Sequence, residues 1–299
     1  MKFSPVKEAR LGLDFYVLRD ASGSTAATTG TNNTNLNTLG RGHADYWLST
    51  AFPTAFTYKP ATFYYLGVDG AVTAGPVALS GYAFYNFGKI EFIGGTFAGD
   101  NVVPGSSTDV KAFAVDLRAE MNAGPGKFFV EGAYVSGSGS GDSDWKAPIT
   151  GSNYALSGST PLNSMDLLIL FPNADNINST MALANDVQNK GRGIMAAAVG
   201  FSMKLNDQLS TKVGAGYLAD TKNAVGTNVG GVTIKKHKAF ELNANLNYTV
   251  VKGMDIGIYG GYAFLTDWED YGAQTIGVAN MTQDADNIYT AIFRMNYAF

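Results

Sequence analysis

Residues 289–299 read Tyr-Thr-Ala-Ile-Phe-Arg-Met-Asn-Tyr-Ala-Phe, with an apolar or aromatic side chain at every second position. Tyr289 and Phe293 fall on this parity, whereas Thr290 and Arg294 fall on the other. Because the side chains of a β-strand alternate between two faces, the pattern predicts a strand with one apolar and one polar face. A soluble protein would need a second layer over the apolar face, but in a bilayer the hydrocarbon covers it.

The same alternation occurs in ten segments of the chain. Most are about 10 to 13 residues long, a length that suits a tilted strand crossing a bilayer. We assign the more apolar parity of each segment to the outside of the fold. The segments are residues 8–18, 62–73, 77–87, 110–122, 128–134, 195–203, 209–217, 240–250, 254–264 and 289–299.

The connections between these segments are of two kinds. Tight turns are expected near residues 75, 124, 207 and 252, and they alternate with long polar loops at about 19–60, 93–108, 136–192, 219–237 and 266–286. Bacterial outer-membrane barrels show this asymmetry, with short periplasmic turns and long extracellular loops. We therefore predict an all-β fold, a transmembrane up-and-down antiparallel β-barrel of about ten strands. Residues 1–299 form one domain in this prediction, with both termini periplasmic. The alternative is a soluble β-sandwich.

Composition excludes several other classes of protein. The 299 residues include 36 Gly, 16 Tyr and 18 Phe, but no Cys, so disulfides, thiolate metal sites and covalent c-type haem are excluded. The net charge of −4 arises without a basic run, which argues against nucleic acid as a partner. No apolar run approaches the roughly 18 to 20 residues of a membrane helix. Residues 1–5 show no signal peptide, so we expect either a mature chain or part of a longer protein.

The inner parity of the strands supplies the predicted pore-lining residues. If the turn near Gly124 is symmetric, Asp116 pairs with Ala133, Arg118 with Glu131 and Glu120 with Phe129. A ten-strand barrel is near the size at which side chains can fill the interior, so conduction depends on small inner residues that leave a gap. These are Ala196, Ala198, Gly200, Gly214 and Gly216. The predicted pore-lining residues are Arg10, Asp14, Asp69, Asp116, Arg118, Glu120, Glu131, Lys204, Lys212, Glu241, Asn245 and Arg294.

The loop at 136–192 contains an apolar run at residues 167–171, followed by a short helix predicted over about 181–189. Apolar residues in a loop indicate that it packs on something. One interpretation is that it folds into the barrel mouth as a constriction; the other is a loop core on the rim or a subunit contact. The constriction candidates are Leu167, Ile169, Phe171 and Met181.

Residues suited to catalysis or metal binding are sparse. The two histidines, His43 and His237, are expected to be solvated loop residues. Acidic loop clusters could hold a divalent cation through oxygen ligands, but they lack the spacing of known calcium motifs. They are Asp142 with Asp144, and Asp267 with Glu269 and Asp270. We predict no catalytic residues, no metal and no cofactor.

The C-terminal part of the chain resembles a known family. Residues 254–264, an acidic loop and residues 288–299 resemble the end of deltaproteobacterial porins, which are similar in turn to the alginate-export family of barrels. Tyr297-Ala298-Phe299 resembles the terminal signal of outer-membrane proteins, although Arg294 stands where a glycine is common. The resemblance implies a channel, often a homotrimer. Export-type members have more strands, which leaves open whether these ten are the C-terminal part of a wider barrel.

These patterns predict an outer-membrane porin of a Gram-negative bacterium. It would be integral to the lipid and would allow passive diffusion of small hydrophilic solutes or ions, without enzymatic activity. The alternative is a closed barrel that acts through its loops, as a rim-active hydrolase similar to omptins or as a binding protein. A barrel that houses a partner such as a cytochrome is a third possibility, for which this chain carries no haem motif.

Overall fold

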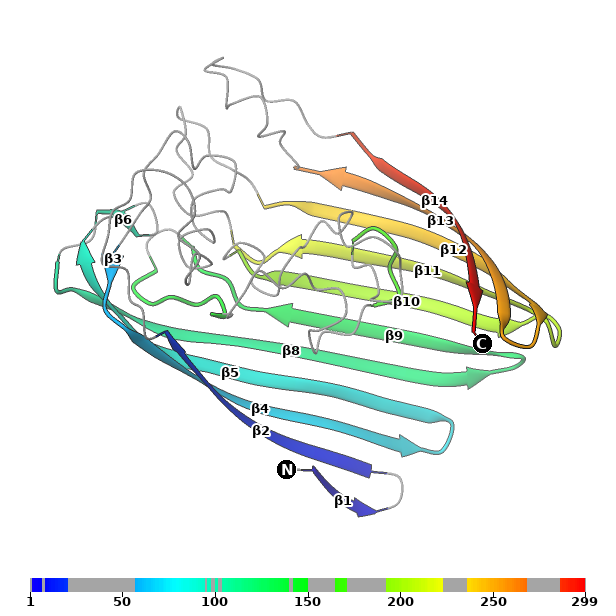
Figure 1. Cartoon of the computed structure of the whole chain (residues 1–299), viewed down its shortest axis with the longest axis horizontal. Helices are drawn as coiled ribbons and strands as arrows, with labels where there is room; N and C mark the ends of the chain where they lie inside the picture. The colour runs from blue at the N-terminus through cyan, green and yellow to red at the C-terminus, as the bar shows by residue number, and fades with distance from the viewer. Residues whose placement is uncertain are drawn as a thin grey trace.

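Ten long antiparallel strands form one curved wall (Figure 1). The computed structural model describes residues 2–6, 9–20, 57–94, 96–97, 100–101, 104–139, 142–149, 165–170, 192–222, 236–267 and 286–298. Within these ranges, no helix is long and apolar enough to span a membrane. The long strands are β2 (Ala9–Asp20), β4 (Ala61–Ala74), β5 (Val77–Gly94), β8 (Ser107–Ala123), β9 (Gly126–Val135), β10 (Ile194–Lys204), β11 (Leu209–Asp220), β12 (Lys238–Val251), β13 (Met254–Thr266) and β14 (Ile288–Tyr297).

The strands follow an up-and-down order, in which each long strand pairs with its neighbour in the chain. Four shorter strands accompany them. β1 (Lys2–Val6) adds to the edge beside β2, β3 (Thr57–Tyr58) pairs with β5, and β6 (Thr96–Phe97) pairs with β7 (Asp100–Asn101) as a separate hairpin. Among the described residues β1 and β14 do not pair with each other, so the wall has two edges. The prediction of ten antiparallel strands is confirmed.

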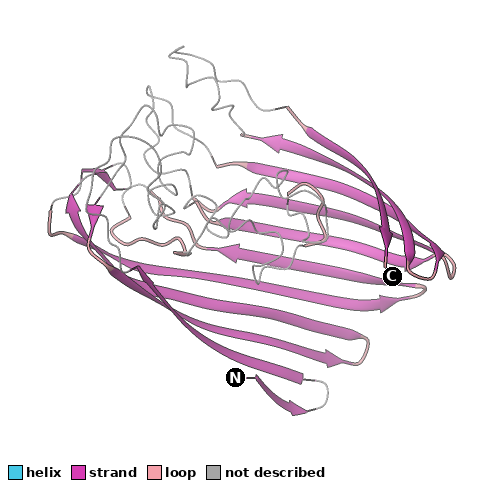
Figure 2. Ribbon diagram, in the orientation of Figure 1, coloured by secondary structure: helices cyan, strands magenta, loops and turns pink. Residues whose placement is uncertain are grey.

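Tight turns join the strands at one end of the wall, and long connections join them at the other (Figure 2). Gly75, Gly124 and Gly253 occupy three of the four predicted turns with φ of 61°, 57° and 87°. Glycine suits these positions because a Cβ atom would be strained in the left-handed region. The fourth turn, after β10, is closed by Asn206, whose Oδ1 accepts hydrogen bonds from the N–H groups of Gln208 and Leu209.

The outer face of the wall is apolar along every long strand. Large side chains there remain accessible in the isolated chain, with exposed fractions of 65% for Leu117, 60% for Ile258 and 68% for Phe293. No second sheet covers this face within the described part of the chain, so a soluble sandwich is not observed there. Soluble monomers rarely expose a continuous apolar surface of this extent. The outward assignment of these residues is confirmed.

The inner face carries the polar parity. Asp116, Glu131 and Glu241 lie on it and are almost fully buried, whereas their strand neighbours on the other face are apolar and exposed. Burial of ionisable groups on the concave side of a sheet requires hydrogen-bond partners there. Arg118 of β8 is the partner of Glu131, and a loop supplies the partners of Glu241, as described below.

Several expected boundaries change in the structure. The predicted loop at 93–108 is shorter, because β5 continues to Gly94 and β8 begins at Ser107. β2 likewise extends to Asp20, two residues beyond its predicted end. The reason is pairing: Asp20 still opposes Ala61, and Glu91 still opposes Ser107, so backbone partners extend past the apolar alternation.

A pair of adjacent substitutions tests which face of the wall contacts lipid. Leu246 and Asn245 are neighbours near the middle of β12 and point to opposite faces. We expect Leu246→Arg to lower the free energy of unfolding in vesicles by about 2–4 kcal/mol, the cost of arginine near the midplane of a bilayer. Asn245→Arg should have a much smaller effect. Equal effects in urea-unfolding experiments on the two variants would contradict the assignment.

Candidate functional site

A first segment of the loop that follows β9 packs inside the wall, at residues 142–149. The Trp145 N–H donates to Asp109 O at 2.8 Å, and the Lys111 N–H donates to Trp145 O at 2.8 Å. Trp145, Ala147 and Ile149 are buried against the inner sides of β4, β5 and β8, in a cluster with Phe63. The Ile149 N–H donates to the buried Asn86 Oδ1 at 2.8 Å, which fixes the end of the segment. This segment covers the loop end of the wall on its β4–β8 side.

A second segment of the same loop, residues 165–170, packs deeper on the inner face. Leu167, Leu168, Ile169 and Leu170 are all buried, in a cluster with inner residues of β8 to β13. The burial of each such side chain is worth about 1.5–3 kcal/mol before the cost of ordering the loop. We call residues 165–170 the inward segment.

Small residues on the inner face make room for the inward segment. A Cβ atom at Gly216 would lie 2.5 Å from Leu167 Cδ1, and one at Gly261 would lie 3.4 Å from Ile169 Cδ1. Ala196 and Ala198 belong to the same buried cluster. The Phe129 ring occupies the space above Gly200. Over Gly214 lies the Asn243 side chain. The small residues considered in the sequence therefore do not leave an empty gap, because the inward segment, Phe129 and Asn243 lie over them.

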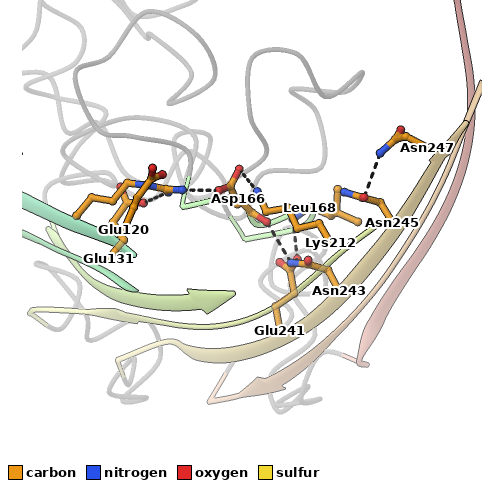
Figure 3. A network of polar contacts seen from close by, with 10 residues as sticks. Glu120, Glu131, Asp166, Leu168, Lys212, Glu241, Asn243, Asn245 and Asn247 are labelled. Atoms are coloured by element: carbon orange, nitrogen blue, oxygen red, sulfur yellow. Dashed lines mark hydrogen bonds and ion pairs between the residues drawn. The ribbon is translucent and has the colours of Figure 1, made fainter. Parts of the chain in front are cut away.

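Glu241 anchors the inward segment through backbone hydrogen bonds (Figure 3). Its Oε1 accepts from the Leu168 N–H at 2.6 Å, and its Oε2 accepts from the N–H groups of Ile169 and Leu170 at 2.9 and 2.8 Å. The Asn243 Nδ2 also donates to Glu241 Oε1, at 2.9 Å. Hydrogen bonds to a charged acceptor are strong, and four donors offset the cost of burying one carboxylate.

Arg118 holds the other end of the inward segment. Its guanidinium donates to Glu120 at 2.9 Å, to Glu131 at 2.6 Å and to Asp166 at 2.9 Å. Lys212 also pairs with Asp166. The pairings predicted for this hairpin, including Arg118 with Glu131, are confirmed by the register of β8 and β9.

The turn that presents Asp166 is strained. Met165 and Asp166 have φ of 49° and 55°, in the left-handed region that residues other than glycine seldom adopt. Such conformations cost of order 1–3 kcal/mol and persist only where surrounding contacts impose them. Here the ion pairs of Asp166 with Arg118 and Lys212 supply those contacts.

The other predicted pore-lining residues lie on the inner face in three settings. Arg10 pairs with Asp69 at 3.6 Å near the β1 edge, and Asp14 lies further along β2 on the same side of the wall, opposite Gly67. Lys204 is exposed at the turn end of β10. Asn245 accepts a hydrogen bond from Asn247, and Arg294 donates to Asn296. The structure brings Arg118, Glu120, Glu131 and Lys212 together around Asp166, but it does not join Arg10, Asp14, Asp69 or Arg294 to that cluster.

Some expectations fall outside the described residues, and one is wrong. His43, Phe171, Met181 and the helix expected over 181–189 lie outside them. His237 is not solvated, because its side chain is buried at the residue that precedes β12. Its Nδ1 lies 3.2 Å from Asp220 Oδ2, and Arg192 Nε lies 3.4 Å from the same oxygen. These three side chains join the loop ends of β10, β11 and β12.

The acidic loop residues Asp142 and Asp144 are paired with lysines. Asp142 contacts Lys146 at 2.9 Å, and Asp144 contacts Lys111 at 3.1 Å. Glu269 and Asp270 lie outside the described residues. No group of three or more metal-binding side chains gathers in the ranges that the structure describes.

Sequence reasoning did not identify Asp166 or Asn243 as parts of this site. Asp166 belongs to a loop without periodicity, so no pattern indicates its partner. The sequence nevertheless contains a signal for the packing of this loop. Small residues on the inner parity of neighbouring strands, opposite an apolar run in a long loop, indicate that the loop packs there.

Comparison with known proteins finds similarity to solved structures alone. No protein-family model matches the chain, and no curated protein matches it. Among solved structures, the chain is similar to the outer membrane channel DcaP of Acinetobacter baumannii, with 14% identity and a TM-score of 0.42 over 99% of this chain and 60% of that one. It is also similar to OccK10 (OpdN) of Pseudomonas aeruginosa, with 12% identity and a TM-score of 0.36 over 89% and 66%.

A third similar structure is OmpTdeltaL8, a loop-deletion mutant of an outer membrane protein of Vibrio cholerae. Its identity is 12% and its TM-score 0.35, over 98% of this chain and 76% of that one. The chain thus spans between 60% and 76% of the length of these three proteins. Identities and TM-scores this low carry no inference about solutes or partners.

Removal of the Glu241 carboxylate should release the inward segment. We expect Glu241→Ala to leave three backbone N–H groups without their acceptor and to lower the free energy of unfolding by about 3 kcal/mol. Hydrogen exchange of the Leu168, Ile169 and Leu170 amides should accelerate at the same time. Glu91→Ala, which removes an exposed pair with Lys59, is the control and should leave that exchange unchanged. Unchanged exchange in Glu241→Ala would contradict the anchor.

Asp142 gives the loop a predictable response to acid. Burial acts to raise the pKa of Asp142, but the Gly139 N–H, Lys146 and Lys222 outweigh it and hold the pKa below its usual range. The stabilisation is therefore fully present above an ordinary pKa of about 3.9 and is lost as pH falls through the lowered folded-state value. We expect acidification below about pH 4 to expose Trp145, three residues away, and to shift its emission to longer wavelength.

The measurement needs a variant with one tryptophan, made by Trp47→Phe and Trp268→Phe. The further substitution Asp142→Asn should weaken this shift in the same pH range, because the side chain no longer titrates. An identical pH profile with and without Asp142→Asn would show that other groups control the exposure of Trp145.

Proposed function

We propose that this protein is an integral outer-membrane porin that allows passive diffusion of small hydrophilic solutes or ions. The observation that carries the proposal is the distribution of side chains on the wall. Apolar side chains are exposed on its outer face, and ionic or amide side chains gather on its inner face. A wall of this kind has its apolar side covered only in lipid, and its polar side then faces a lumen.

The inward segment is the proposed constriction. Leu167 and Ile169, both predicted as constriction residues, pack against the inner wall, and Asp166 presents its carboxylate beside Arg118 and Lys212. Pore width and the charges that line it set selectivity in channels of this type. Solutes would pass beside the inward segment, along the polar side chains that it leaves uncovered.

The orientation and assembly in this proposal follow general rules for bacterial barrels. By these rules the short turns would lie on the periplasmic side and the long loops outside, and we propose that both chain termini are periplasmic. Porins are often trimers, and we propose a homo-oligomer on the resemblance of the C-terminal strands.

One observation favours the alternative of a rim-active hydrolase. His237 and Asp220 converge at the loop end of the wall, as a general base and its orienting carboxylate would. Both side chains are almost fully buried, however, and Asp220 also accepts the His237 N–H and lies near Arg192. This arrangement suits a structural contact better than attack on an external substrate. Peptide hydrolysis that His237→Ala abolishes would instead support a rim enzyme.

Single-channel recording in a planar bilayer tests the porin proposal. We expect the refolded protein to conduct, and replacement of Leu167, Leu168, Ile169 and Leu170 by serine to raise the conductance, since each substitution removes apolar burial that holds the inward segment in place. Glu241→Ala should raise it by an independent route. Serine at Leu205 in the exposed β10–β11 turn is the control. Protein that is folded, by its heat-modifiable gel mobility, and passes no current would refute the proposal.

A further inference from the structure

A hollow of about 520 Å³ lies at the turn end of the inner wall. It is lined by the turn after β8 and by inner residues of β8 to β12, among them Lys127, Lys204 and Lys212. None of the described residues that line it is Asp or Glu. The hollow is distinct from the apolar cluster around the inward segment, although Lys212 borders both.

Strand register places five hydrogen-bond donors in a continuous row across this hollow. The residues pair from strand to strand in the order Asn122, Lys127, Ser202, Lys212 and Asn245. A second row beside it runs through Lys204, Ser210 and Asn247 in the same way. Directly opposed side chains have Cβ atoms about 4.5–5.5 Å apart, so one small ligand can contact neighbours in a row. We call the first five residues the donor row.

The amide oxygens next to this row are already occupied. Asn247 Nδ2 donates to Asn245 Oδ1 at 3.1 Å, and Tyr259 Oη donates to Asn247 Oδ1 at 2.7 Å. Each of these amide oxygens thus has one lone pair engaged by a neighbouring side chain of the wall. Asn245 lines the hollow, and its Nδ2 group can only donate.

Lys204 differs from the other two lysines of the hollow, which are paired with carboxylates. Lys127 pairs with Glu120 at 2.9 Å, Lys212 pairs with Asp166, and Arg118 bonds to Glu120, Glu131 and Asp166. These pairs join three cations to three carboxylates, and a fourth carboxylate, Asp116, hydrogen-bonds to Glu131 but does not line the hollow. Lys204 has no ion pair among the described residues and is exposed. It therefore adds an unpaired positive charge to a lining that contains donors and no carboxylate.

We propose that the donor row and Lys204 form a binding site for a small solute that carries an oxyanion, either a carboxylate or a phosphate. The proposal rests on the proposed porin function, because it names the class of solute that the lumen retains near its turn end. Charge-assisted hydrogen bonds from ammonium groups, together with amide and hydroxyl donors, suit the several acceptor oxygens of such a group. Exposure keeps each contact weak, as passage through a channel requires.

Isothermal titration calorimetry on the refolded protein in detergent, at low ionic strength, tests the site without requiring current. We expect inorganic phosphate and acetate to bind and uncharged glycerol not to bind. Lys204→Gln should weaken binding by about 3- to 10-fold, the range for one exposed charge. Asn245→Asp, which replaces a donor with a carboxylate, should weaken it further. Lys89→Gln, on an exposed lysine of β5 that does not line the hollow, is the matched control.

The outcomes separate this inference from the porin proposal. Binding that Lys204→Gln and Lys89→Gln affect equally, or no binding of either anion by folded protein, would overturn the site. Binding of phosphate with loss in Lys204→Gln but no current in a bilayer would leave the site standing and refute the porin. If acetate binds and phosphate does not, the site takes carboxylates; the reverse result assigns it to phosphates.

Discussion

The fold depends on an antiparallel register that is unbroken through the middle of every long strand. The shifts in register lie near strand ends, between Phe3 and Val6, between Thr57 and Tyr58, and between Thr249 and Val251. Because side chains alternate with a period of two, a slip of one residue in any pairing would move all apolar groups of that strand to the inner side. Continuous register therefore keeps one face for lipid and the other for polar contacts.

The packing on the inner face depends on positions that have no side chain. Gly216 and Gly261 have no side chain to fill the interior, and the inward segment takes their place. The chain thus builds part of its interior from a loop and not from the wall. Glu241 then fixes the backbone of that loop, while Asp166 fixes its charged tip, so polar and apolar contacts hold the same six residues.

Local patterns in the sequence predict the strands, the turns and the Arg118–Glu131 pair, because each depends on residues close in the chain or related by a tight hairpin. The inward segment is only partly predictable. Its apolar run indicates packing, but its partners lie more than 70 positions away on β12, and neither period nor spacing points to Glu241. Burial of His237 was missed for the same reason, since its neighbours Asp220 and Arg192 are brought to it by strand pairing across a long loop.

The two edges of the wall limit how it can insert into a membrane. An edge strand such as β14 presents a row of backbone N–H and C=O groups, and hydrocarbon offers them no partner. Each such group left unsatisfied costs several kcal/mol, which over a strand of ten residues exceeds the stability of a typical domain. A seam of main-chain hydrogen bonds along both β1 and β14 is therefore a condition for insertion, whichever strands provide it.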